Sequence, residues 1–295
     1  MTPSAREASA NGPASAGPFG APLDALAPPD MARKAEAVGV AKAGMGGATT
    51  FALAVLAGAF IAIGAAFATN TVAGTSSLPY GVTRLLAGLA FSLGLILVVV
   101  AGAELFTGNN LIVIAWASRR VPTVRLLRNW AIVYTGNFVG AVATAALVFE
   151  ARQYEFGNGQ VGKAALTIAA TKTSYGFGQA IALGMLCNAL VCIAVWLCYS
   201  ARTTGDKILA IVPPIAAFVA AGFEHSVANM YFVPFALLVK TDQAFVSAHQ
   251  AGDLSGLTWG HFVTGNLIPV TIGNVIGGSM MVGAIYWFVY LRQPS

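Results

Sequence analysis

The chain has 295 residues, of which 57% are hydrophobic and only 9% are charged, and its mean hydropathy is +0.74. Soluble domains carry roughly 25% charged residues, so this composition excludes an ordinary soluble protein and indicates a chain whose solvent is lipid. The net charge of +5 comes from basic residues between apolar stretches, which is typical of membrane proteins and not of nucleic-acid-binding proteins.

The N-terminal segment is rich in Ala, Pro, Ser and Gly, and it lacks the positive start and apolar core of a signal peptide. We expect residues 1–34 to form a disordered cytoplasmic tail. Residues 35–292 are expected to form one transmembrane domain.

Six apolar stretches follow, most of them of about the length needed to cross a hydrocarbon core roughly 30 Å thick. They lie near residues 48–69, 82–117, 126–149, 178–200, 206–239 and 262–291. The second and fifth are too long for one span and contain ionisable side chains in their middle, so we expect transmembrane helices 2 and 5 to be broken there. Free N–H groups at the start of the resumed half-helices would suit an anion. Residues 150–176 are more polar and could include a surface helix.

The two overlong stretches resemble each other. Both read Ala-Gly-x-Glu with an Asn five residues after the Glu, giving Glu104 with Asn109 and Glu224 with Asn229. The helix after each carries Gly-Asn-x-x-Gly, at 136–140 and 273–277; alone, this pattern indicates close helix packing. Chance is the alternative, because Ala and Gly are common here. Two patterns in matching order favour a repeat, and so predict an all-α integral membrane protein with six transmembrane helices in two inverted three-helix repeats.

Topology follows from the basic residues. Most of the 16 Lys and Arg residues fall on the side of the two termini if the chain crosses six times. The positive-inside rule then places both termini in the cytoplasm, and we expect a multi-pass protein of the bacterial inner membrane.

His225 is the one histidine within a predicted span. A lone buried histidine is normally a packing residue, but this one lies at a repeated break, which favours function. Such a group could hand a proton to a passing anion. Glu104 and Glu224 are expected to cap helix ends or to pair with lysines, because a free carboxylate would repel anions.

No cofactor or metal site is predicted. The three cysteines, Cys187, Cys192 and Cys198, share one apolar stretch at spacings that do not suit a metal. We interpret them as small buried hydrophobic residues.

Four segments carry a resemblance to a known family. They are GFEHSVANM at 222–230, AGAELFTGN at 101–109, FSLGLILVV at 91–99 and NLIPVTIGNVIGG at 266–278. Together they resemble the formate/nitrite transporter family, in particular its formate channels, and the likeness extends from about residue 35 to residue 292. The resemblance implies a homopentamer, with an aquaporin-like fold and one pore in each protomer.

The resemblance also implies roles for individual residues. His225 would be the central pore histidine, with Thr107 facing it and Asn266 beside the path. The hydrophobic constrictions would be Phe91, Leu95, Leu105 and Phe218, although core or lipid-facing packing is the simpler interpretation of Phe91, Leu95 and Phe218. A polar group that supports the site and attracts anions would comprise Lys172, Asn188 and Glu224. Gly265 departs from the acidic residue of formate channels, which bears on fine selectivity.

The predicted function is a channel or transporter for small monovalent anions, with formate favoured and proton coupling through His225 as an option. A nitrite- or hydrosulfide-preferring protein is the near alternative. A water or neutral-solute channel would show paired Asn-Pro-Ala motifs, which this sequence lacks. A membrane-embedded enzyme would need a cluster of ligands or a nucleophile–base pair, and one His beside one Glu supplies neither.

Overall fold

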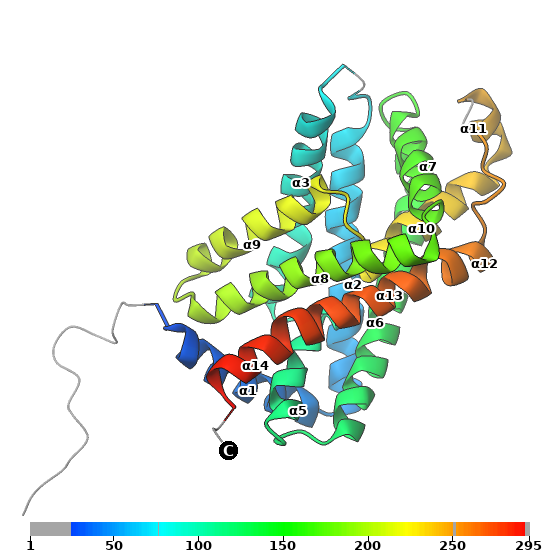
Figure 1. Cartoon of the computed structure of the whole chain (residues 1–295). Helices are drawn as coiled ribbons and strands as arrows, with labels where there is room; N and C mark the ends of the chain where they lie inside the picture. Colours follow the sequence, from blue (N-terminus) through cyan, green and yellow to red (C-terminus); the bar gives the residue numbers. More distant parts are fainter. Residues whose placement is uncertain (1–24, 76, 250–251, 293–295) are drawn as a thin grey trace, which may run out of the picture.

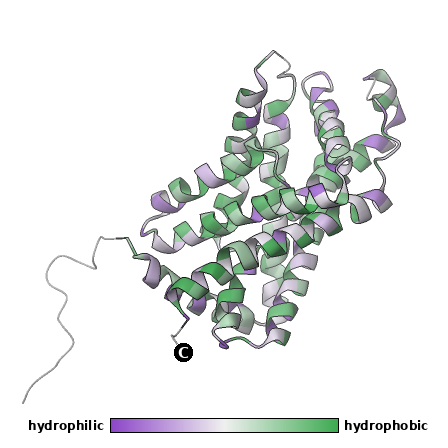
Figure 2. Cartoon of the chain, viewed as in Figure 1, coloured by the Kyte–Doolittle hydropathy of each residue, from purple (hydrophilic) through white to green (hydrophobic). Residues whose placement is uncertain are grey.

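The computed structural model describes residues 25–75, 77–249 and 252–292, and the regular structure in these ranges is helical, without strands. Five helices are long and apolar enough to cross a membrane (Figure 1). These are α2 (Gly47–Val72), α3 (Tyr80–Ala101), α6 (Thr123–Glu150), α8 (Phe177–Ser200) and the continuous C-terminal helix Trp259–Tyr290. Hydrophobic residues cover most of their length, and hydrophilic ones gather toward their ends (Figure 2). The protein is therefore an all-helical one with several membrane-spanning segments.

The helical structure is interrupted within the second and the fifth apolar stretch. Helix α3 ends at Ala101, and the chain resumes as α4 (Phe106–Asn109), η1 (Asn110–Ile112) and α5 (Val113–Ala117). In the second half, α9 (Thr204–Ala220) ends and α10 (Ser226–Thr241) follows. Gly102 and Gly222 stand just after the two helix ends with φ angles of 81° and 77°. A residue with a Cβ would be strained in this left-handed conformation, so glycine is what allows the chain to leave each helix.

The first helix, α1 (Pro28–Gly44), begins inside the segment that the sequence predicts as a tail, so the predicted boundary at residue 34 is wrong. Its Pro28 and Asp30 lie in the first turn, where a missing N–H and a negative charge both favour a helix start. Met31 and Ala35 are buried in a cluster with Trp196. Burial against the rest of the protein, which composition does not reveal, orders this segment. Residues 1–24 lie outside the described part of the chain.

The long helices form two groups that cross. Helix α2 packs along α6 and α3, and α8 packs along α9 and the C-terminal helix. In Figure 1, α8 and the C-terminal helix run side by side across α2 and α6. The resumed segments contact the opposite half of the chain, because α10 packs against α6 and α2, and α4 packs against α8 as well as α6. Each half thus contributes one short helix to the other half.

Glycines permit the closest of these contacts. A Cβ added at Gly140 would collide with the carbonyl oxygen of Val55, and one at Gly277 with that of Met185. The two Gly-Asn-x-x-Gly patterns are therefore packing seams, as the sequence predicts.

Three further helices follow α6 and α10 in the chain. They are η2 (Gln153–Glu155), α7 (Gln160–Thr173) and α11 (Gln243–Ala248). Helix α7 falls within the polar segment 150–176. The C-terminal helix consists of α12 (Trp259–His261), η3 (Phe262–Leu267), α13 (Ile268–Val275), η4 (Ile276–Ala284) and α14 (Ile285–Tyr290). Its η3 and η4 parts have π-helical backbone, which widens the helix and redirects its side chains; the sequence does not predict this.

Candidate functional site

His225 occupies the N-cap position of α10, directly after the second break. Its Nδ1 accepts a hydrogen bond from the Ala228 N–H at 3.0 Å. A neutral imidazole has one donor and one acceptor nitrogen, so this bond places the proton on Nε2. That nitrogen lies 3.0 Å from the Thr107 hydroxyl, and the His225 side chain is only 2% exposed. The backbone of α10 therefore fixes the tautomer of this buried ring.

Thr107 comes from α4, in the other break, and is fully buried. Its carbonyl oxygen accepts a hydrogen bond from Asn188 Nδ2 at 3.3 Å. Asn188 also donates to Asn110 Oδ1 at 2.8 Å and to the Asn274 carbonyl at 2.6 Å. These bonds from α8 hold the threonine in place opposite the histidine.

Lys172 and Glu224 form a buried ion pair, with Nζ and Oε1 2.7 Å apart. The other carboxylate oxygen accepts hydrogen bonds from Asn229 at 2.7 Å and Asn266 at 3.3 Å. Asn266 Nδ2 also donates to the Lys172 carbonyl at 2.7 Å. Both oxygens of Glu224 are thus engaged, so the residue is a fixed counter-charge. Asn188, which is predicted to belong to the same polar group, bonds to Thr107, Asn110 and Asn274 and not directly to this pair.

A matching cluster surrounds the first break, where Glu104 pairs with a lysine as the sequence predicts, although the sequence analysis does not single out Lys42 as its partner. Lys42 Nζ lies 2.7 Å from Glu104 Oε1, and Asn109 donates to the other oxygen at 2.7 Å. Asn129 takes the place of Asn266, because it accepts from Asn109 at 3.0 Å and donates to the Lys42 carbonyl at 3.2 Å. The sequence contains a signal for this residue. Lys172 precedes the first span of the second half, so an internal repeat predicts a lysine in the same place before the first span of the chain, and Lys42 is the last lysine before that span.

Two asparagines pin the breaks to the long helices. Asn137 donates to the Glu104 carbonyl and accepts from the Phe106 N–H, both at 2.9 Å. Asn274 does the same for Glu224 and Ser226, again at 2.9 Å. The N–H groups of Phe106 and Ser226 are therefore already bonded, so the expectation that they are free to bind an anion is wrong at these two positions.

Two cavities approach this centre from opposite sides. The α1 cavity, of about 340 Å³, is lined by parts of α1, α3, α4, α8 and α9, and includes Leu95 and Leu105. The α7 cavity, of about 360 Å³, is lined by α7 and by the facing ends of α3, α9 and α10. It includes Phe91, Phe218 and His225. Thr107 lines neither cavity and, through its bond to His225, lies between them.

Apolar side chains separate the cavities. All four predicted constriction residues are at most 3% exposed: Phe91, Leu95, Leu105 and Phe218. The Phe91 and Phe218 rings meet edge to face with centroids 5.6 Å apart, and the Phe218 ring stacks on His225 at 5.9 Å. The two phenylalanines are therefore brought together with the histidine, whereas Leu95 and Leu105 line the α1 cavity.

Lys172 and Glu224 also line the α7 cavity, and Lys42 and Glu104 line the α1 cavity. Asn188 and Asn266 line neither cavity; they bond to Thr107 and to Glu224, respectively, which lie closer to the path. Within the described residues, no three His, Cys, Asp or Glu side chains are placed to hold a metal ion. The arrangement offers an anion the Thr107 hydroxyl, which itself accepts from His225 Nε2–H, and a compensated lysine on each side.

The sequence and the fold both match known proteins. The family described as "Formate/nitrite transporter" matches residues 29–288. The formate channel FocA of Escherichia coli (strain K12) is 45% identical over 276 residues, covering 92% of this chain and 97% of that protein. A probable formate transporter of Methanothermobacter thermautotrophicus is 38% identical over 264 residues, covering 82% and 88%.

Two solved structures share the fold. One, described as a pentameric formate channel with formate bound, has a TM-score of 0.78 and 44% identity, covering 83% of this chain and 98% of its own. The other, described as an FNT family ion channel, has a TM-score of 0.72 and 28% identity, covering 88% and 98%. Because the family match spans most of the sequence and includes both breaks, this chain belongs to the formate/nitrite transporter family.

Proposed function

We propose that the protein conducts small monovalent anions, and formate in particular, from one cavity to the other past Thr107 and His225. The observation that carries this proposal is the buried Thr107–His225 pair between two cavities that are otherwise sealed by apolar side chains. The formate channels similar to this chain support formate as the anion.

The chemistry of the centre suits a small anion. A bare anion pays a large desolvation penalty on entering an apolar constriction. The Thr107 hydroxyl can donate to a carboxylate, and the Nε2–H of His225 can do so once the anion takes the place of the Thr107 oxygen. Hydrogen bonds to a charged acceptor are the stronger kind. Lys42 and Lys172 draw anions toward the centre, while their glutamate partners keep them from holding an anion too tightly. A pore must bind its ion weakly enough to release it.

Proton transfer through His225 would couple anion import to protons. A formate that accepts a proton becomes a neutral acid, which crosses apolar surroundings at a much lower cost. The Ala228 bond sets a condition on this step, because Nδ1 is an acceptor there. A second proton on the ring would turn Nδ1 into a donor, so the start of α10 would have to shift.

We further propose six membrane passes, in which α3 with α4–α5 and α9 with α10 form broken second and fifth spans. The matching lysine, glutamate and asparagine bonds at the two breaks support two inverted repeats. Both termini would lie in the cytoplasm of a bacterial inner-membrane protein. A reporter inserted near Pro122 should then be cytoplasmic; a periplasmic reporter there would overturn this orientation.

We also propose that five copies assemble, each with its own pore. The support is the pentameric formate channel of the same fold. Native mass spectrometry of the detergent-solubilised protein would give five chains per particle.

The function is tested by anion uptake into liposomes that contain the purified protein. Formate, nitrite, lactate and chloride are compared with and without a pH gradient, with protein-free liposomes as the control. We expect formate to enter fastest and chloride slowly. A preference for nitrite over formate would move the protein to the nitrite-conducting side of its family, and no flux of any of the four would refute the proposal.

A further inference from the structure

Arg84, on the second turn of α3, lines the α7 cavity. Its Nη2 donates to the carbonyl oxygen of Val219, near the end of α9. Its Nε is buried and has no hydrogen-bond partner among the described residues. Leaving a buried donor unpaired costs more than a made hydrogen bond gains. The guanidinium is thus anchored at one nitrogen and has an unused donor at another.

Arg84 also lacks a counter-charge. Three charged side chains line the α7 cavity: Arg84, Lys172 and Glu224. Both oxygens of Glu224 are taken by Lys172 and by asparagines, and within the described residues no carboxylate pairs with Arg84. Because arginine stays protonated in proteins, this wall of the cavity carries one uncompensated positive charge.

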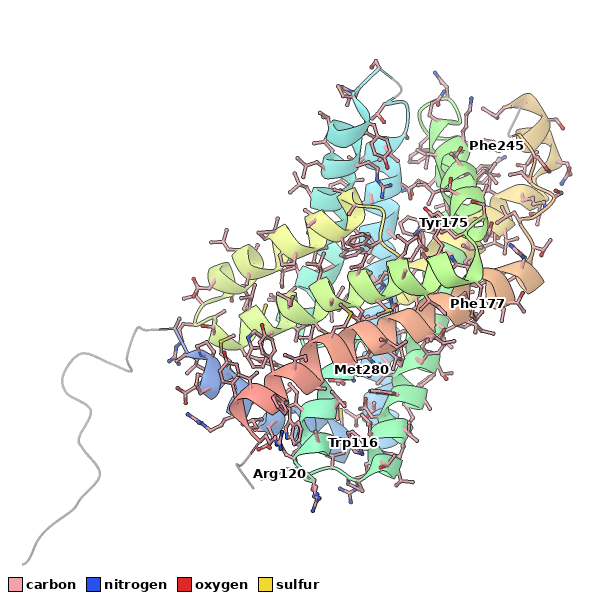
Figure 3. All side chains as sticks on the ribbon, in the orientation of Figure 1. Trp116, Arg120, Tyr175, Phe177, Phe245 and Met280 are labelled. Carbon is pink, nitrogen blue, oxygen red and sulfur yellow. The ribbon has the colours of Figure 1, made fainter. Side chains whose placement is uncertain are left out.

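The surroundings of Arg84 suit a carboxylate. Hydroxyl side chains line the same cavity, among them those of Tyr80, Thr83 and Tyr175. Tyr175 lies where α7 gives way to α8 (Figure 3) and within electrostatic range of Arg84 and Glu224. Arginine is well suited to planar carboxylates, because its N–H donors lie in one plane. Hydroxyls around it can donate to the remaining lone pairs of such an anion.

We propose that Arg84 forms an anion-binding site in the α7 cavity, where a small monocarboxylate is held before it reaches His225. This inference rests on the proposed function and adds a second binding step to it. The guanidinium would make two interactions: Nη2 donates to the Val219 carbonyl near the end of α9, and Nε donates to the bound anion. The site is specific to the α7 side, so it acts on anions that enter from that side.

The test compares Arg84→Gln and Arg84→Lys with wild type, and Arg152→Gln is the matched control. Arg152 has an exposed side chain that pairs with Glu155 and does not line the cavity, so its replacement removes the same charge elsewhere. Formate uptake is measured in proteoliposomes with the α7 side outward. We expect Arg84→Gln to raise KM by about tenfold, the order expected for one charge-assisted hydrogen bond, while kcat stays within about twofold of wild type. Arg152→Gln should leave KM unchanged.

Arg84→Lys separates the effect of the positive charge from that of the planar N–H donors, because lysine keeps the charge but lacks those donors. The proposal predicts a KM between those of wild type and Arg84→Gln. A wild-type KM in both variants, or an equal rise in Arg152→Gln, would overturn it. A transport-independent readout is the rise in Tm with added formate in detergent, which should be smaller for Arg84→Gln than for Arg152→Gln. A wild-type protein that takes up no formate yet shows this difference would refute the proposed function and leave the binding site standing.

Discussion

Thr107 and His225 are 118 positions apart in the chain, yet the Thr107 hydroxyl lies 3.0 Å from His225 Nε2. Each residue stands just after a break in its own half of the protein. The contact is therefore the point where the two halves meet, and it places two neutral hydrogen-bonding groups between two cavities.

Replacing His225 tests its part in proton movement. We expect His225→Asn to fold, to keep a polar centre and to pass formate with little dependence on pH, because asparagine does not titrate. His225→Phe should lose both the donor to the anion and the cap on α10, and so slow uptake strongly. Flux in liposomes is measured from about pH 5 to pH 8, a range that spans the ordinary histidine pKa. An Asn variant with the wild-type rate and pH profile would remove His225 from the proton path.

The apolar seal gives a second prediction. If Leu95 and Phe218 narrow the path, Leu95→Ala and Phe218→Ala should raise conductance or let larger anions such as lactate pass. As core residues alone they would cost stability, on the order of 2–5 kcal/mol, and flux per folded channel would stay the same. Single-channel conductance and thermal unfolding are measured on the same preparations. Val133→Ala, a fully buried position that lines neither cavity, serves as the packing control.

The ion pair between Lys172 and Glu224 gives a third prediction. Lys172→Met alone leaves Glu224 charged and without its cation, and breaking a buried pair in this way costs roughly 3–5 kcal/mol. The double change Lys172→Met with Glu224→Gln removes both charges and should recover part of the lost thermal stability. Formate uptake should stay low in the double variant, because the lysine that attracts anions is gone. Full recovery of uptake would show that the pair only supports the fold.

A fourth prediction concerns the packing seam. Gly140→Ala should prevent correct assembly of α2 with α6, since the new methyl group would collide with the Val55 carbonyl. Gly178→Ala is the matched control, because a Cβ there meets no atom within 4 Å. Size-exclusion chromatography after membrane extraction distinguishes the two. A well-folded Gly140→Ala protein would mean that the helices can separate at little cost.

Much of the fold could be predicted from the sequence because lipid imposes strong rules. Apolar length predicts membrane-spanning helices, and the interruption around Glu104 is predicted because an ionisable residue inside an apolar stretch demands an explanation. The pairing of Glu224 with a lysine follows from the cost of burying a bare carboxylate. These features depend on residue type and on spacing alone.

Other features depend on how helices cross, which the pattern does not encode. Asn188 and Asn266 are both polar residues in apolar helices, but only the crossing of α8 and η3 decides which carbonyl each one meets. Lys42 could be assigned to topology as easily as to the site, because it precedes the first apolar stretch. The π-helical turns around Asn266 likewise have no signature in composition.

The exchange of short helices between the two halves has a consequence for biosynthesis. The Thr107 carbonyl and the Asn110 side chain bond to Asn188, which the ribosome adds some 80 residues later. Until α8 is inserted, the Asn110 side-chain oxygen would face hydrocarbon unpaired, at a cost of several kcal/mol, and the Thr107 carbonyl would keep only its bond from the Asn110 N–H. The first half therefore cannot settle as a finished unit in the bilayer, and the insertion machinery must shelter it from lipid until the second half arrives.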